Sequence, residues 1–151
     1  MNFIRLENAR TEEQGSVMRQ IAKDNVCPFC SEHLSTYHKK PILTEGKHWV
    51  LTENQWPYEG TKVHLLAITK KHATSIADLS PEASAELFEL FKNAAKDFGI
   101  IGGTLAIRFG PSTKYASSVF HLHAHLIEPD VENSNHQGVK FPVSKPSTQQ
   151  K

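Results

Sequence analysis

The chain has 151 residues, 38% of them hydrophobic, which is enough for one domain with its own core. Its 17 basic and 16 acidic side chains leave a formal net charge of +1, and no basic run carries interleaved aromatic residues, so nucleic acid is not an expected partner. The sequence shows neither a secretory apolar core near its start nor an apolar run long enough to cross a bilayer, so we expect a cytoplasmic protein without a membrane partner.

The first part of the chain predicts a helix followed by a cysteine pair. Residues 11–23 place acidic residues first and apolar residues at helical spacing, which indicates an amphipathic helix within an N-terminal extension, residues 1–26. Cys27 and Cys30 follow with two residues between them. In a reducing compartment this spacing favours metal binding or redox chemistry over a structural disulfide.

Three strands and a loop are expected next. Residues 41–45 and 48–53 predict short strands joined through Gly46, with Trp49 and Leu51 on one face of the second. Residues 54–60 predict a loop because they contain proline and glycine, and residues 63–69 predict a strongly apolar strand.

Residues 81–98 predict the clearest helix. Ser80 precedes it as an N-cap, Pro81 occupies the first turn, and Gly99 stops it. The expected buried face consists of Leu87, Phe88, Leu90, Phe91, Ala94, Ala95 and Phe98.

The last expected strands are residues 104–109 and 118–127, and a polar tail, residues 129–151, follows them. The tail has too little apolar content for a packed unit, although Phe141 and Val143 could dock on the body or on a partner subunit. The elements together predict an α+β fold, with an antiparallel sheet of about five strands packed by one long helix, in a single domain spanning residues 1–128.

Segment 120–127, with the sequence FHLHAHLI, carries the most functional information. In a strand, His121, His123 and His125 line one face, while the apolar residues between them pack on the other. Neutral imidazole is a nucleophile, a base and a metal ligand, so three in a row favour group transfer or metal binding.

This pattern resembles the signature of the histidine-triad (HIT) family of nucleotidyl hydrolases and transferases. In the family's order, residues 64–72 (HLLAITKKH) are similar to its central strand, and Asn54 with the Trp-Pro-Tyr of residues 56–58 resembles its nucleoside-contacting loop. The Cys27 and Cys30 pair resembles the zinc knuckle of bacterial members. The resemblance spans residues 27–127.

The resemblance implies a homodimer whose two sheets join, with one site per subunit. It also implies hydrolysis or transfer at the α-phosphorus of a nucleotide, the substrate being a phosphoramidate, a mixed anhydride or a dinucleoside polyphosphate. A positioned neutral nitrogen attacks such a phosphorus better than hydroxide does at neutral pH, so we expect His123 to form a nucleotidyl-histidine intermediate that water then hydrolyses. His121 and His125 would donate hydrogen bonds to the phosphoryl oxygens or orient the nucleophile.

Nucleotide contacts are also expected from the loop and from the residues before the triad. Asn54 is expected on the ribose, and Trp56 and Tyr58 either stack on the base or cover the core. Ser117 stands where the family commonly has a glutamine near the bridging phosphate, and Ser118 keeps a hydroxyl that resembles the family's phosphate contact.

Other departures from the family pattern leave substrate choice open. Val63 and Thr69 replace the usual glycine and proline around the central strand, and Arg108 stands where many members have asparagine. Arg108 and Lys114 either neutralise a longer polyphosphate or are solvated charges, and the second interpretation is favoured.

Structural zinc takes four Cys or His ligands, and Cys27 and Cys30 supply two of them. The resemblance adds His72 and His121, giving one zinc per subunit, while His33, His38 and His64 remain rival ligands. No catalytic metal is required, because histidine supplies the nucleophile. A pair of reduced structural thiols and a redox pair are the alternatives for the cysteines.

Two other classes of function remain open. Three imidazoles can hold a catalytic zinc in a metallohydrolase, although alternate residues on one strand lie about 7 Å apart and converge poorly on one ion. The other class is a nucleotide-binding protein without turnover, for which the missing glutamine is the only hint.

Overall fold

The computed structural model describes residues 3–110, 115 and 117–146. Lys114, a candidate phosphate contact, lies outside the described residues, as does most of the loop that contains it. None of the helices in the described ranges is both long and apolar enough to cross a membrane.

Five strands of the described chain form one antiparallel sheet in the order β1-β2-β3-β5-β4. Their bounds are β1 Ile42–Glu45, β2 Trp49–Glu53, β3 Thr61–Thr69, β4 Thr104–Ile107 and β5 His123–Pro129. The expected α+β fold with a five-stranded antiparallel sheet is confirmed.

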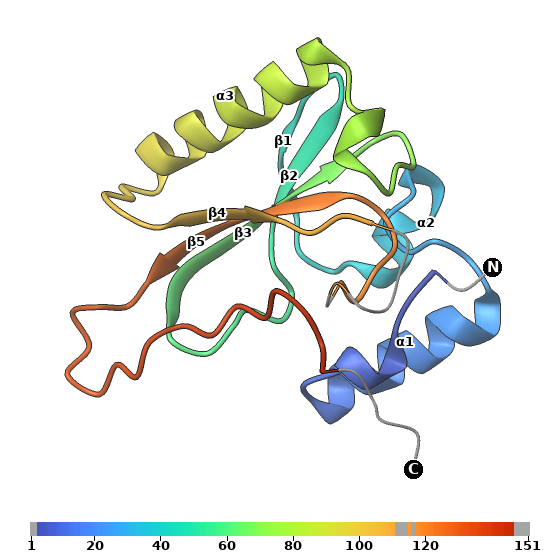
Figure 1. Ribbon diagram of the computed structural model, residues 1–151, viewed down its shortest axis with the longest axis horizontal. Helices are drawn as coiled ribbons and strands as arrows, with labels where there is room; N and C mark the ends of the chain where they lie inside the picture. The colour runs from blue at the N-terminus through green and yellow to red at the C-terminus, as the bar shows by residue number, and fades with distance from the viewer. Residues whose placement is uncertain (1–2, 111–114, 116, 147–151) are drawn as a thin grey trace.

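The long helix α3 (Pro81–Asp97) covers one face of this sheet (Figure 1). Because side chains alternate along a strand, one set of strand residues meets the helix, and this core includes the three apolar residues expected behind the triad, Leu122, Ala124 and Leu126. The opposite face carries the histidines of β5. The core and the chemistry therefore occupy opposite faces of the same two central strands.

The buried face of α3 is narrower than the sequence predicts. Leu87, Leu90, Phe91 and Ala94 lie on one stripe and pack against the sheet. Phe88, which falls one position off that stripe, is 67% exposed, and Phe98, which caps the helix beyond its last turn, is 39% exposed. Assigning these two to the core was wrong, because apolar character alone does not bury a side chain.

The carboxylate of Glu86 ties α3 to the turn between β1 and β2. It accepts backbone N–H hydrogen bonds from Lys47, His48 and Trp49 at 2.7 to 2.8 Å. The indole of Trp49 adds a hydrogen bond of 2.7 Å to the carbonyl of Ala83. Charge-assisted bonds of this kind are stronger than neutral ones, so they fix the angle between helix and sheet.

The other side of the sheet is covered by α1 (Glu12–Asp24) and α2 (Ser31–Tyr37), as Figure 1 shows. α1 begins after Thr11, whose side chain caps Gln14, and it packs Met18 and Ile21 against Ile4. The sequence analysis missed α2, because seven residues are too few for helical periodicity to stand out. Two short 3-10 helices of the described chain are η1 (Leu6–Asn8) and η2 (Ile76–Asp78).

Most predicted boundaries agree with the structure within two residues, but the start of β5 does not. The strand begins at His123 and not at Ser118. Before it, the chain bends to make hydrogen bonds outside the sheet, from Phe120 N–H to the Phe3 carbonyl and from Leu122 N–H to the Ala73 carbonyl. His121 therefore precedes the regular strand.

Candidate active site and metal site

Backbone contacts set the tautomers of the first two triad histidines. His121 donates from Nε2 to the carbonyl of Thr69 at 2.6 Å, so its Nδ1 carries the lone pair. His123 donates from Nδ1 to the carbonyl of His121 at 2.7 Å, so its lone pair is on Nε2. Both rings are buried, His121 at 2% exposed and His123 at 7%. The first two triad members thus present lone pairs from different ring nitrogens.

A fourth histidine, His64 on β3, sets the tautomer of His125. Tyr58 N–H donates to His64 Nδ1 at 3.2 Å, so the ring proton of His64 is on Nε2. That nitrogen lies 2.8 Å from His125 Nδ1, which accepts the bond, and the ring proton of His125 is therefore on Nε2. The His125 Nε2 atom is buried and has no hydrogen-bond partner in the described ranges. His125 Nε2 is therefore a hydrogen-bond donor that is available to a ligand.

The sequence analysis missed His64 as a site residue and considered it only as a rival zinc ligand. Its signal was available in part, because His64 starts the segment that resembles the family's central strand. The sequence does not reveal the register in which β3 pairs with β5. Leu66 lies opposite His125 and His64 lies opposite Ile127, which makes His64 the diagonal neighbour of His125 on the same face.

Burial keeps these rings neutral at physiological pH. Removal from water lowers the pKa of His123 and of His64 to about 4, and it lowers the pKa of His125 well below its usual value. The charges of Arg108 and Arg10 act in the same direction on His64 and His125. Neutral imidazole is the nucleophilic form.

Four side chains form a group with the chemistry of a metal site. Cys27, Cys30, His72 and His121 each offer one ligand atom, and these atoms all lie within 4.8 Å of one another. His121 Nδ1, which carries the lone pair, is 3.3 Å from Cys27 Sγ, and His72 Nδ1 is 3.4 Å from Cys30 Sγ. Two thiols and two imidazoles are a donor set that tetrahedral zinc accepts, so the residues present fit the metal.

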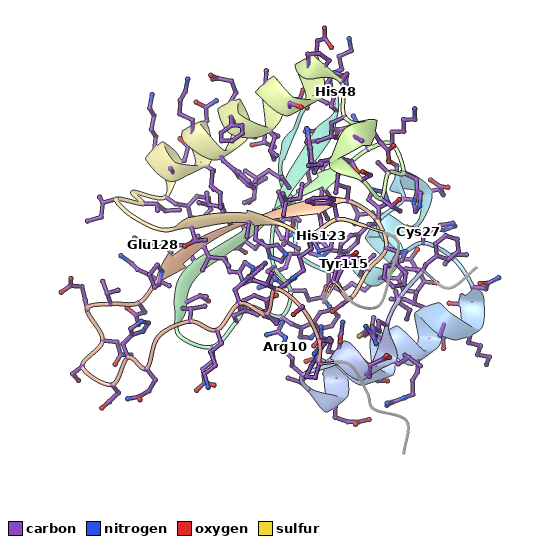
Figure 2. All side chains as sticks on the ribbon, viewed as in Figure 1. Arg10, Cys27, His48, Tyr115, His123 and Glu128 are labelled. Carbon is purple, nitrogen blue, oxygen red and sulfur yellow. The ribbon has the colours of Figure 1, made fainter. Side chains whose placement is uncertain are left out.

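The same group brings together segments that are distant in the chain. Cys27 and Cys30 immediately precede α2, His72 follows β3, and His121 precedes β5. Figure 2 shows the labelled Cys27 beside α2 and the labelled His123 near the centre of the sheet. Both thiols are free, and burial together with the neighbouring Cys27 raises the pKa of Cys30 to about 12. A raised pKa does not suit a reactive redox thiolate.

Phe29, between the two cysteines, connects the two sites. Its ring centroid lies 5.1 Å from that of His123 and 6.2 Å from that of His121, both edge to face. The rival ligands lie elsewhere: His38, for example, is 2.7 Å from the Thr52 hydroxyl. His64, as shown above, bonds His125.

A cavity of about 100 Å³ opens between α1 and the triad face of the sheet. Its apolar wall includes Met18 and Ile21 of α1, and its polar lining includes Asn54, Trp56, Ser118, His123 and His125. The Oδ1 atom of Asn54 accepts a hydrogen bond of 2.9 Å from the Trp56 N–H, and its Nδ2 atom lies 3.2 Å from His64 Nε2. The structure thus brings most of the expected nucleotide contacts to one cavity.

Ser117 is placed differently from Ser118. It is 8% exposed and donates its hydroxyl to the carbonyl of Val119 at 2.8 Å, while its own carbonyl accepts a bond from Asn8. It does not belong to the residues that line the cavity. A role for Ser117 in nucleotide binding stays a prediction.

The three triad rings do not converge on a common metal position. The lone pair of His121 faces the thiols, that of His123 is on Nε2, and His125 Nε2 carries a proton. This geometry disfavours a catalytic zinc held by three histidines and favours separate tasks for the three rings.

The antiparallel sheet with one covering helix, and the three histidines at its centre, define a histidine-triad domain. Residues 26–139 match the model of the family described as "Scavenger mRNA decapping enzyme C-term binding", and the chain belongs to this family. The resemblance found in the sequence is thereby confirmed.

Individual relatives agree with this assignment. An uncharacterized HIT-like protein of Chlamydia muridarum is 31% identical over 86 residues, which are 55% of this chain and 66% of that protein, just under two thirds. A zinc-bound histidine triad family protein from Mycobacterium smegmatis superposes with a TM-score of 0.56 at 24% identity, covering 78% of this chain and 84% of that one. A HIT family hydrolase from Clostridium thermocellum gives 0.54 at 24% identity, covering 77% and 96%. At these identities the two structures show the shared fold.

Proposed function

We propose that the chain hydrolyses or transfers a nucleotide at its α-phosphorus through a nucleotidyl-histidine intermediate on His123. One observation carries this proposal: His123 is held with its Nδ1 proton on the carbonyl of His121, so Nε2 keeps a lone pair. Beside it stands the buried, unpartnered Nε2 donor of His125. A nucleophile next to a preorganised donor is the arrangement that phosphoryl chemistry requires.

The reaction would proceed in two balanced steps. Nε2 of His123 forms a bond to the α-phosphorus, and the bond from phosphorus to the leaving group breaks with its electron pair on that group. Water then attacks the phosphorus, loses a proton to solvent, and restores the free imidazole. His125 would hydrogen-bond a phosphoryl oxygen as its negative charge grows, and His64 is the positioning residue that keeps the donor proton of His125 on the correct nitrogen.

Mass spectrometry of the acid-sensitive, base-stable adduct tests this proposal. A nucleotide mass trapped on the peptide that contains His123 would support it. Turnover with no histidine adduct, under quench conditions that preserve a phosphoramidate standard, would contradict it and favour direct attack by water.

We also propose that Cys27, Cys30, His72 and His121 hold one structural zinc ion per chain. The support is the donor set and its spacing, together with the zinc bound to the relative from Mycobacterium smegmatis. A zinc ion there would join α2 to the two central strands without supplying the nucleophile, because His123 is not one of the four grouped ligands.

Asn54 is proposed to contact the ribose hydroxyls. Its Oδ1 already holds the loop through Trp56, but a carboxamide has further donor and acceptor capacity at the cavity. Asn54→Ala should weaken the binding of ribonucleotides by about 1 to 3 kcal/mol and the binding of their 2′-deoxy counterparts much less. Calorimetric titration with both nucleotides checks this. Equal loss of both would mean that Asn54 only shapes the loop.

A homodimer is proposed through the open edge of β4. Among the described residues β4 is the last strand of the sheet, with Leu105 47% exposed and Phe109, just beyond it, 46% exposed, and an apolar strand edge of this kind favours pairing with a second copy. Sedimentation equilibrium of the chain should give twice the monomer mass, and Leu105→Lys should shift it toward monomer. A wild-type chain that stays monomeric at micromolar concentration would contradict this.

A further inference from the structure

Two arginines meet at the ring of Tyr58, beside the triad. The guanidinium carbon of Arg10 lies 4.5 Å from the centre of the Tyr58 ring, and Arg108 donates from Nη2 to the Tyr58 hydroxyl at 2.9 Å. The same ring stacks on His125 with centroids 6.0 Å apart. Arg10 precedes α1 and is labelled in Figure 2, whereas Arg108 follows β4, so the fold brings together two residues that are far apart in the sequence.

Neither charge is neutralised by the contacts that hold it. Arg10 donates to the carbonyls of Trp56 and Pro57, and Arg108 donates to the carbonyl of Pro142 and to Tyr58. All four acceptors are neutral oxygens, and no ion pair in the described part of the chain involves either arginine. A guanidinium has five N–H donors, so each side chain keeps three that these bonds do not use.

Holding the two charges close together is costly without an anion. Partial removal of the Arg10 guanidinium from water lowers the pKa of Arg10; Tyr58 opposes this shift, and the charge of Arg108 adds to it. Both arginines line the cavity that also contains His123 and His125, and its lining residues include no aspartate or glutamate. The two guanidiniums therefore make the cavity positively charged. This charge favours a ligand with more negative charge than the α-phosphate alone carries.

The C-terminal segment positions Arg108. Phe141 lies under the Arg108 guanidinium, 3.8 Å from its carbon to the ring centre, and the ring also packs edge to face against His125 at 5.3 Å. Together with the Pro142 carbonyl, this holds Arg108 at the site face of the sheet. These contacts favour a binding role over the solvated charge that the sequence alone favoured.

We propose that Arg10 and Arg108 form a subsite for a phosphate group beyond the α-phosphate, so that the preferred substrates are nucleotides whose leaving group is itself a phosphate. The inference rests on the proposed function and chooses among its substrates: polyphosphates over phosphoramidates. When His123 Nε2 bonds to the α-phosphorus, the bridging P–O bond breaks and the leaving phosphate keeps the electron pair. That oxygen needs no proton at neutral pH, because the two guanidiniums stabilise its charge. Arg10 lies outside the residues that match the family, so the N-terminal extension supplies one of the two arginines of this subsite, and the matched domain supplies the other.

Paired substrates test the subsite. Adenosine 5′-phosphoramidate and diadenosine triphosphate share the nucleoside and the α-phosphate but differ in the leaving group, and a guanosine pair covers the other purine. We expect wild type to prefer the triphosphate. In Arg10→Gln and in Arg108→Gln, the ratio of kcat/KM for triphosphate over phosphoramidate should fall about tenfold or more. Arg108→Lys keeps the positive charge but loses the paired N–H donors of the guanidinium, so its ratio should lie between those of wild type and Arg108→Gln.

The matched control is Arg19→Gln, which removes the same charge from α1, where Arg19 pairs with Glu12 on the surface. It should leave the ratio unchanged. If both substrates lose the same factor in the Arg10 and Arg108 variants, the subsite does not exist.

A binding measurement separates failure of the subsite from failure of the proposed reaction. If wild type hydrolyses none of these substrates, the proposed function is wrong, and calorimetric titration with inorganic triphosphate still decides the subsite. Binding by wild type that weakens about tenfold in each arginine variant supports the subsite. Equal binding by all variants, or no binding to wild type, overturns it.

Discussion

His123→Ala should lower kcat by about 10³-fold or more while leaving nucleotide affinity within about tenfold of wild type. The imidazole forms a bond only as the reaction proceeds, so it contributes to the transition state more than to ground-state binding. The His123 ring also packs on Phe29. The space left by replacing it with alanine lies beside the nucleotide cavity, so we expect the variant to fold. Steady-state kinetics and calorimetric titration with the nucleoside monophosphate product measure the two effects separately.

His33→Ala provides the control, because His33 lies on α2 and does not line the cavity. It should retain wild-type turnover. Substantial residual activity in His123→Ala, in protein freed of contaminating hydrolase, would rule out the covalent mechanism. Wild-type chain that binds nucleotide tightly and turns over none would support the nucleotide-binding alternative instead.

Loss of one proposed zinc ligand should remove the metal and lower the unfolding temperature by about 10 °C. If free zinc is about a thousand times its Kd, binding to the folded state alone adds about 4 kcal/mol, and a chain of this size shifts by about 2 to 4 °C per kcal/mol. Cys27→Ser removes a buried ligand and His72→Ala an exposed one. Because His72 is exposed, its replacement costs little packing, so its effect reports the metal.

Metal analysis and thermal unfolding of the same samples check this expectation. His33→Ala again serves as the matched histidine, and it should keep one zinc per chain. In His72→Ala the unfolding temperature should fall clearly, while kcat per folded molecule should stay close to wild type, because His123 is not one of the four grouped ligands. Equal zinc content in wild type, Cys27→Ser and His72→Ala would show that the ion, if bound, lies elsewhere.

Local patterns in the sequence predicted the elements that carry the site. Alternation along 120–127 separated the histidines from Leu122, Ala124 and Leu126, and these three do pack against the core under α3. The caps at Ser80 and Gly99 bounded α3 within a residue of its observed end. These signals are readable because a period of two or of 3.6 residues, and the chemistry of a cap, involve only neighbours in the chain.

Other features escaped the sequence analysis because they depend on contacts between distant residues. The bend that removes His121 from β5 is held by Phe3 and Ala73, and the exposure of Phe88 depends on which stripe of α3 packs against the sheet. The start of β5 and the buried face of α3 therefore had to be corrected. A periodic pattern states which residues share a face but does not state what lies opposite it.

The sequence by itself determined the chemical inventory: three alternating histidines, a cysteine pair at knuckle spacing, and a long capped helix that buries the back of the sheet. The tertiary structure alone decided how that inventory is used. The register of β3 against β5 places His64 beside His125, backbone carbonyls assign the protons of His121 and His123, and the packing of distant segments brings Arg10 and Arg108 to one tyrosine. The physical reason is that tautomers and local charge follow from hydrogen-bond partners and burial, which exist only once residues far apart in the chain have packed together.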